Sequence, residues 1–245
     1  MMRGLLRLSA FACTWAAAFP AQAQAAPGPW SATAYVQQSW PKQTETNRQI
    51  RQDINGTFGS HFKTWDDVAN LNLGVQLFRD LTSRWKAGLE LDYSSGQIQG
   101  AETIDTLAGP ATLSFEQKYS TYADLLAVAH YRPLGDQGRW IPFAVAGAGL
   151  AYEKDTTRLS LRNAFLDEGL QVDNSGWFPM FTLGIGLDVY LSGRRTWYAE
   201  VGASYSWARL KHTATATGTL APAPAVTADT DSTGPNVWLG VGRRF

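Results

Sequence analysis

The sequence carries three histidines, the side chains that most often move protons near neutral pH: His61, His130 and His212. Their wide spacing excludes a histidine-rich metal motif. Asp92 and Ser94 could complete a His–Asp–Ser arrangement with His61, but a single histidine in a long polar segment is more often simply solvated. We therefore expect no catalytic residue, no metal site and no cofactor.

Two short acidic segments, 173–175 and 229–231, carry the carboxylates that calcium prefers. Isolated acidic residues in connecting segments are usually solvated, so neither segment is predicted to be a calcium site.

The first 25 residues have the three parts of a secretory signal peptide. Arg3 and Arg7 precede an apolar run over 10–19, and small residues follow up to Ala25, after which we expect cleavage. The apolar run is too short for a membrane anchor. Cys13 could be interpreted as a lipid-attachment residue, but the residues before it fit such a site poorly. The expected mature domain, 26–245, then has no cysteine.

Charged residues make up 17% of the chain and aromatic residues 12%, which argues against intrinsic disorder. Lysine plus arginine and aspartate plus glutamate both number 21. The sequence therefore has no excess of positive charge that would indicate nucleic-acid binding. Beyond the N-terminal segment no 18-residue apolar stretch exists, which excludes a helical membrane bundle.

Alternation of apolar and polar residues dominates from residue 30 onward and predicts strands with two different faces. In Trp85–Tyr93 the odd positions are all apolar, whereas the even positions are Lys, Gly, Glu and Asp. The faces of segment 140–152 cannot be assigned, because both are apolar or small. The predicted strands are 30–40, 71–77, 85–93, 119–131, 140–152, 181–189, 197–207 and 237–245.

Short and long connections alternate strictly between these eight segments. In an up-and-down antiparallel barrel, odd and even connections lie at opposite ends. One end of the barrel therefore carries only short connections and the other only long ones. The sequence therefore predicts an all-β fold, a closed eight-stranded antiparallel up-and-down barrel. The short connections are 80–84, 133–139 and 192–196, and the long ones are 41–69, 94–118, 153–176 and 208–234.

Alternation alone does not distinguish a soluble barrel from a transmembrane one, because the apolar face points inward in the first and toward lipid in the second. Here the polar faces are rich in Gly and Ser, which suits a narrow polar lumen. Aromatic residues also stand at both ends of the strands, as in interfacial girdles. We therefore predict a transmembrane β-barrel. The girdle residues are Trp85, Trp140 and Trp197 after the short turns, and Tyr93, Trp177 and Trp207, with Trp40, Tyr119 and Tyr152, at the other ends.

Two segments resemble small bacterial outer-membrane barrels of the OmpA-like and opacity-type group. Asn236–Phe245 is similar to their closing strand, and Pro142–Tyr152 to a glycine-rich central strand. Arg243 departs from the pattern, which more often has an aromatic residue there. The resemblance implies a Gram-negative outer membrane with periplasmic termini and contact with its lipids. It also implies that assembly machinery recognises the terminal Phe245 and that an unknown extracellular ligand meets the long connections.

Some barrels of this kind modify lipid A, and others are narrow pores. Resemblance to the deacylase type would require a His-x-Ser pair, but His130 and His212 are each followed by other residues. Resemblance to the acyltransferase type would require His61 to act with Asp92 and Ser94. The interior of an eight-stranded barrel is filled by side chains, which argues against a pore. We therefore expect a non-enzymatic protein for surface interaction, adhesion or envelope integrity, with the enzyme and the pore as alternatives.

Charged residues on the lumen face form the remaining candidate site. If strands six and seven pair symmetrically about the turn 192–196, Asp188 lies opposite Glu200, and Arg244 is the hypothesised bridge between them. Two facing carboxylates need a proton or a cation between them. We expect this cluster to be structural. Its predicted members are Asp188, Glu200, Arg244, Lys86, Glu90 and Asp124.

Overall fold

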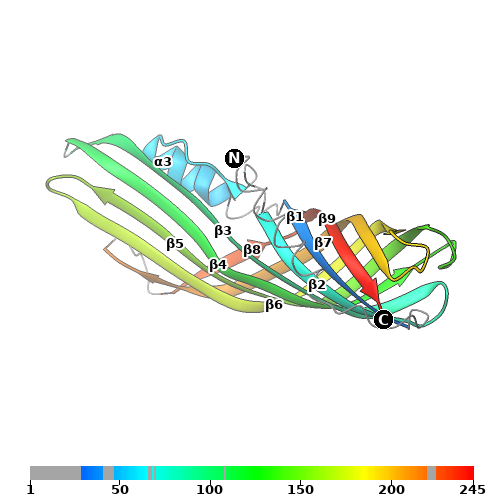
Figure 1. Ribbon diagram of the computed structural model, residues 1–245. Coiled ribbons are helices and arrows are strands. Elements are labelled where there is room, and N and C mark those ends of the chain that lie inside the picture. The colour runs from blue at the N-terminus through cyan, green and yellow to red at the C-terminus, as the bar shows by residue number, and fades with distance from the viewer. Residues whose placement is uncertain (1–28, 41–46, 66–67, 69, 108, 220–224) are drawn as a thin grey trace.

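The computed structural model describes residues 29–40, 47–65, 68, 70–107, 109–219 and 225–245, so the expected signal peptide lies outside the described residues. Its principal elements are strands (Figure 1). They are β1 (Trp30–Ser39), β2 (Asn70–Asp80), β3 (Trp85–Thr106), β4 (Gly109–Tyr131), β5 (Trp140–Arg162), β6 (Asp167–Tyr190), β7 (Trp197–Thr217), β8 (Ala225–Asp231) and β9 (Gly234–Arg244), with a π-helix η1 (Gln49–Asn55) and a short turn of helix α3 (Gly56–Phe58).

The strands form a closed antiparallel ring. Each of β1 to β7 pairs with the next, and β9 pairs with both β7 and β1. β8 is not a ninth strand of the ring. It pairs only with Arg209–Thr215 of β7, and β9 pairs with the earlier part of the same strand, so β8 and β9 occupy one position in the ring. The predicted eight-stranded up-and-down barrel is confirmed.

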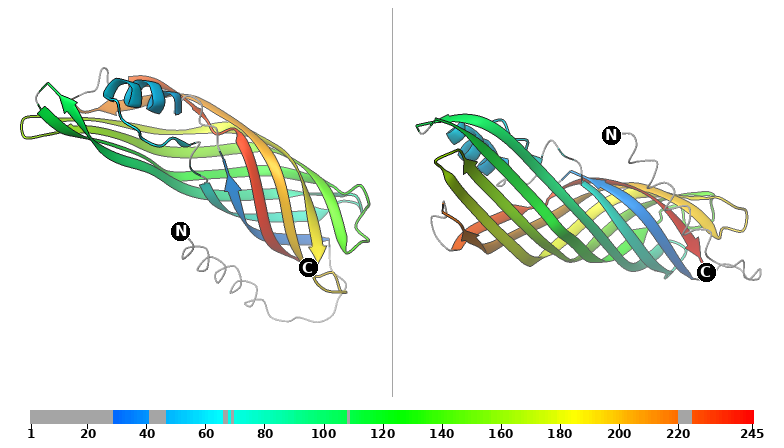
Figure 2. Two further views of the ribbon diagram at one scale, coloured as in Figure 1. Left: turned by 90° about the horizontal axis from the view of Figure 1, so that it is seen from above. Right: turned by 60° about the vertical axis from the view of Figure 1, so that its left-hand side comes forward.

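The strands differ greatly in length. β1, β2 and β9 have 10 or 11 residues, which matches the length needed to cross a membrane, whereas β3 to β7 have 21 to 24. The extra length extends the barrel on one side, as both views in Figure 2 show. The prediction of long loops over 94–118, 153–176 and 208–234 is therefore wrong for most of these residues. They continue the strands, and polar residues on both faces conceal the alternation.

We call the part of the barrel that extends past the girdle residues the projection. It comprises β3 after Tyr93, β5 after Tyr152, β6 before Trp177 and β7 after Trp207, together with the part of β4 that pairs with them and all of β8. The segment 47–65, which contains η1 and α3, packs against it. Trp65 is fully buried there, with its ring edge-on to Tyr119 at 4.7 Å and its indole nitrogen donating to Gln117. The projection thus has an apolar core of its own: Ile50, Phe62, Trp65, Ile98, Leu113, Phe115 and Tyr119. Across the described part of the chain, no helix is long and apolar enough to span a membrane.

The outer surface of the barrel is apolar, whereas its interior combines buried charged and polar residues with a cluster of apolar side chains. Leu73, Val75 and Ile185 are each at least half exposed, whereas Asp124 and Glu200 are buried. This is the reverse of a soluble barrel and defines a transmembrane one. Segment 140–152 also alternates between the two sides, but both of its faces are apolar: Ile141 and Phe143 face the lumen, while Trp140 and Leu150 face outward.

Most of the predicted girdle residues bound this apolar belt. Tyr119 does not, and its prediction as a girdle residue is wrong, because it is buried against Trp65 in the projection. Ten residues separate Trp197 from Trp207, and at about 3.3 Å per residue and a tilt of 35–45° they cover about 25 Å, the height of a barrel's lipid-facing band. Trp85, Trp140, Tyr93, Trp177 and Trp207 are all exposed on it. Trp197 is half-buried, with the Arg243 guanidinium 5.5 Å from its ring centre.

Candidate functional site

At the short-turn end of the lumen, Lys86 lies between two carboxylates. Its Nζ is 3.4 Å from Asp188 Oδ2 and 3.6 Å from Glu200 Oε2, and all three side chains are buried. Asp188 pairs directly with Glu200 across β6 and β7, so the register expected from the symmetric turn is confirmed. We call Lys86, Asp188 and Glu200 the inner lumen cluster.

Arg244 does not belong to this cluster, and the hypothesis that it bridges Asp188 and Glu200 is wrong. Its Nη2 contacts Asp80 at the end of β2 and lies 3.9 Å from Asp136. Arg132 donates to the same Asp80 carboxylate at 2.8 Å. The sequence prediction missed Asp80, because only the closed ring brings the start of β1, the end of β2 and the end of β9 together.

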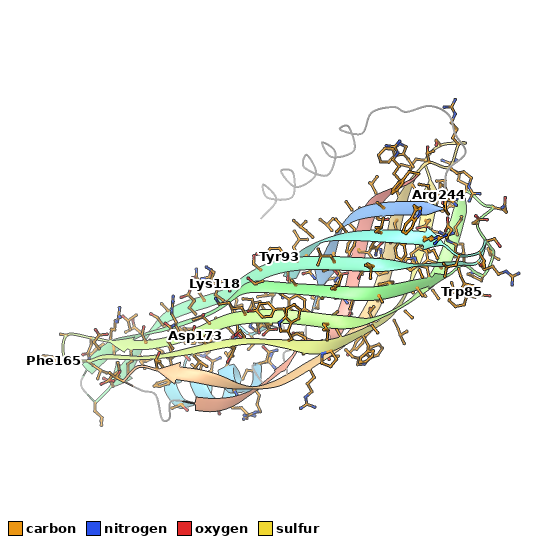
Figure 3. All side chains as sticks on the ribbon, turned by 90° about the horizontal axis from the view of Figure 1, so that it is seen from below. Trp85, Tyr93, Lys118, Phe165, Asp173 and Arg244 are labelled. Carbon is orange, nitrogen blue, oxygen red and sulfur yellow. The ribbon has the colours of Figure 1, made fainter. Side chains whose placement is uncertain are left out.

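Aromatic rings complete the inner lumen. Lys86 Nζ lies 4.5 Å from the ring centre of Phe78 and 5.3 Å from that of Phe143, within cation–π range. His130 stacks on Phe143 with ring centres 4.2 Å apart. The lumen is therefore filled by side chains at this level (Figure 3 labels Trp85 and Arg244 at the same end).

A glycine positions one member of the surrounding shell. Trp238 lies directly opposite Gly202, and its ring occupies the space that a Cβ on Gly202 would need. Its indole nitrogen then donates to Glu200 at 2.9 Å. Glu200 thus has one partner from the lysine and another from β9.

Farther toward the projection, three carboxylates converge without a basic partner. Ligand oxygens of Glu90, Asp92 and Asp124 all lie within 4.8 Å of one another. Asp92 and Asp124 face each other across β3 and β4, and Gln76 donates to Glu90. No Lys or Arg of the described residues forms an ion pair with them. We call these three residues the acidic cluster, and the sequence prediction had joined two of them to the inner lumen cluster.

The histidines are not arranged for catalysis in the part of the chain that the structure describes. His61 is exposed and its ring lies 3.7 Å from Glu102, which is ten residues along β3 from Asp92, or about 33 Å at 3.3 Å per residue. The considered His61–Asp92–Ser94 combination is therefore wrong. His130 is buried among phenylalanines with neither ring nitrogen hydrogen-bonded.

The projection carries an open groove of about 920 Å³. Ion pairs within its walls join Arg158 to Glu116 at 3.5 Å and Arg162 to Asp167 at 2.7 Å. Beside it, hydrogen bonds from Gln171 and Thr156 hold the pKa of Asp173 below its ordinary value. The groove is lined by Gln99, Gly100, Ala101, Ser114, Phe115, Glu116, Arg158, Leu159, Ser160, Arg162, Asp167, Gly169, Leu170, Gln171, Thr217, Gly218 and Thr219.

No protein-family model matches the chain, and neither does any curated protein. Several solved outer-membrane protein structures show distant similarity to the chain. The outer membrane protein OprG from Pseudomonas aeruginosa is 14% identical, with 91% of this chain and 99% of that chain covered and a TM-score of 0.46. A major outer membrane protein from Thermus thermophilus is 9% identical, with 88% and 99% covered and a TM-score of 0.44. The E. coli outer membrane protein W is 16% identical, with 91% and 100% covered and a TM-score of 0.42. Because these similarities are distant, the function proposed below rests on the residues of the barrel itself.

Proposed function

We propose that this protein is a non-enzymatic outer-membrane barrel that presents the projection to the outside of a Gram-negative cell for surface interaction. The observation that carries the proposal is a projection with its own apolar core and an open groove, built on a barrel whose lumen is filled. A lipid-embedded barrel needs only 9–11 residues per strand, so the additional length of β3 to β7 has no role in crossing the membrane.

In this proposal the short turns and both termini face the periplasm. Phe245 ends the closing strand with its ring exposed on the apolar belt, which is where assembly machinery would recognise it. Outer-membrane lipids cover the belt, and the extracellular ligand contacts the groove.

Orientation is tested with single cysteines, because the expected mature chain has none. Phe165→Cys at the tip of the projection should react with an impermeant maleimide on intact cells. Gly193→Cys in the turn between β6 and β7 should react only after lysis. The opposite labelling pattern would invert the proposed orientation.

Function is tested by shortening one hairpin. Thr157 pairs with Val172, so replacing residues 158–171 with a two-residue Asn-Gly turn shortens β5 and β6 and leaves the barrel intact. We expect normal heat-modifiable barrels and loss of cell binding to surfaces coated with glycans or matrix proteins. Unchanged binding together with increased sensitivity to detergent would favour a role in envelope integrity instead.

A further inference from the structure

We propose that the acidic cluster is a calcium site in the lumen, with Glu90, Asp92 and Asp124 as its charged ligands. This inference does not depend on the proposed surface interaction. It starts from charge: three carboxylates from two neighbouring strands meet in a confined space, and the lysine nearest in the lumen is engaged by Asp188 and Glu200. Like charges at such separations repel strongly unless a proton or cation lies between them.

A second observation also points to a cation. Gln76 and Asn72 are both more than nine-tenths buried, and each has a side-chain oxygen without a hydrogen-bond donor: Oε1 of Gln76 and Oδ1 of Asn72. The Gln76 amide is anchored to the cluster because its nitrogen donates to Glu90. Asn72 lines the same small polar cavity as Asp124. Buried acceptors without donors are costly, and a metal ion satisfies several at once.

Gly74 lets two side chains of the site pack directly against the backbone of β2. A Cβ at Gly74 would clash with the Asp92 carboxylate and with the ring and hydroxyl of Tyr35. The Tyr35 hydroxyl and Asp92 therefore share the space above this glycine. The donors gathered at the cluster are three carboxylates, the Gln76 amide oxygen and the Tyr35 hydroxyl, all of them oxygen.

The donor set favours calcium over magnesium. The ligand oxygens of the acidic cluster lie close enough together to share one ion. Calcium accepts carboxylates and amide oxygens in irregular arrangements, whereas magnesium requires a near-ideal octahedron and usually retains several of its waters.

Access is from the projection end. The polar cavity that contains Asp124 has a volume of about 40 Å³ and continues to Glu153 and Ser232, near the edge of the projection. In the other direction, Lys86 and its aromatic neighbours fill the lumen. Ions can therefore reach the site from the projection but cannot pass beyond it, so the site is not part of a conduction path.

The experiment uses the full mature barrel folded in detergent and stripped with EDTA. Isothermal titration should show one Ca²⁺ bound per barrel, and calcium should raise the unfolding temperature. In Asp92→Asn combined with Asp124→Asn, affinity should fall at least about tenfold, or 1.4 kcal/mol. The same variant should be more stable than wild type in EDTA, because the repulsion is relieved. Asp105→Asn, an exposed acid of β3, is the matched control and should behave as wild type.

A wild-type barrel that neither binds Ca²⁺ nor gains thermal stability from it would overturn the proposal, as would equal losses in the control. If the double variant does not fold, Tb³⁺ bound to the wild type gives a second readout. Nearby tyrosine should sensitise its emission, and Ca²⁺ should displace it at concentrations at least about tenfold below those needed for Mg²⁺. Absence of calcium-displaceable emission would equally reject the site.

Discussion

At the scale of single side chains, the inner lumen cluster sets the energetics of the barrel interior. Replacing Lys86 by Met leaves Asp188 and Glu200 facing each other without a cation, which typically costs about 3–5 kcal/mol. Combining Lys86→Met with Asp188→Asn and Glu200→Gln should restore most of that loss. Urea unfolding in detergent measures both. Equal destabilisation in the single and triple variants would show that the three residues are not coupled.

Gly202 offers a second test at this scale. A valine there would displace the Trp238 ring and remove the hydrogen bond to Glu200, and overpacking of this kind costs about 1–3 kcal/mol. The control is Gly193→Val in an open turn, where a Cβ meets nothing within 4 Å. We expect the unfolding midpoint to fall for Gly202→Val and to stay unchanged for Gly193→Val.

Some of these contacts were predictable from the sequence and others were not. The Asp188–Glu200 pairing depends only on one symmetric turn, so it could be derived from residue numbers. Whether Lys86 or Arg244 lies between the two carboxylates depends on how the ends of β1, β2 and β9 are staggered around the ring. No local pattern encodes that stagger, so the role of Asp80 was missed as well.

At the scale of elements, the segment 47–65 should be stabilised by its packing on β3 and β4. Trp65→Ala removes a fully buried ring and its hydrogen bond to Gln117, a change that typically costs about 3–5 kcal/mol. We expect this segment to become sensitive to added protease while the barrel still migrates as a folded, heat-modifiable species. Phe165→Ala, at an exposed tip, is the control. Loss of the folded barrel in Trp65→Ala would contradict the independence of the two parts.

The strands were predictable where they cross the membrane and not beyond it. Between the girdles, lipid on one side and the lumen on the other impose strict alternation, as in Trp85–Tyr93. In the projection, water reaches much of both faces. Gln97, Gln99 and Glu116 therefore resemble loop residues, although they lie in a regular ladder.

At the scale of the whole molecule, a lumen filled at Lys86 should not conduct. Planar bilayers containing the purified barrel should show no steady ion conductance, because an eight-stranded interior has room only for side chains. Single-channel recording tests this, with an established porin as the positive control. Stable openings would revive the pore alternative.

The proposed non-enzymatic role in surface interaction also predicts no lipid chemistry. Lipid A mass spectra from cells with and without the protein should be identical. A mass shift of one acyl chain on expression would establish an enzyme. It would then direct attention to His61 and Glu102 as the exposed acid–base pair.

The hairpin of β5 and β6 has a mechanical consequence. Its ladder runs without a register shift from Arg162–Asp167 at the tip to Trp140–Val189 at the base. Phe165 therefore stands at the end of a stiff arm rooted in the barrel wall (Figure 3). Tension along the arm pulls β5 and β6 in the same direction, so it loads the ladders that join them to β4 and β7 in shear, where many perpendicular hydrogen bonds act together. A cell held by this tip in flowing liquid would transmit the drag through two continuous strands into its membrane.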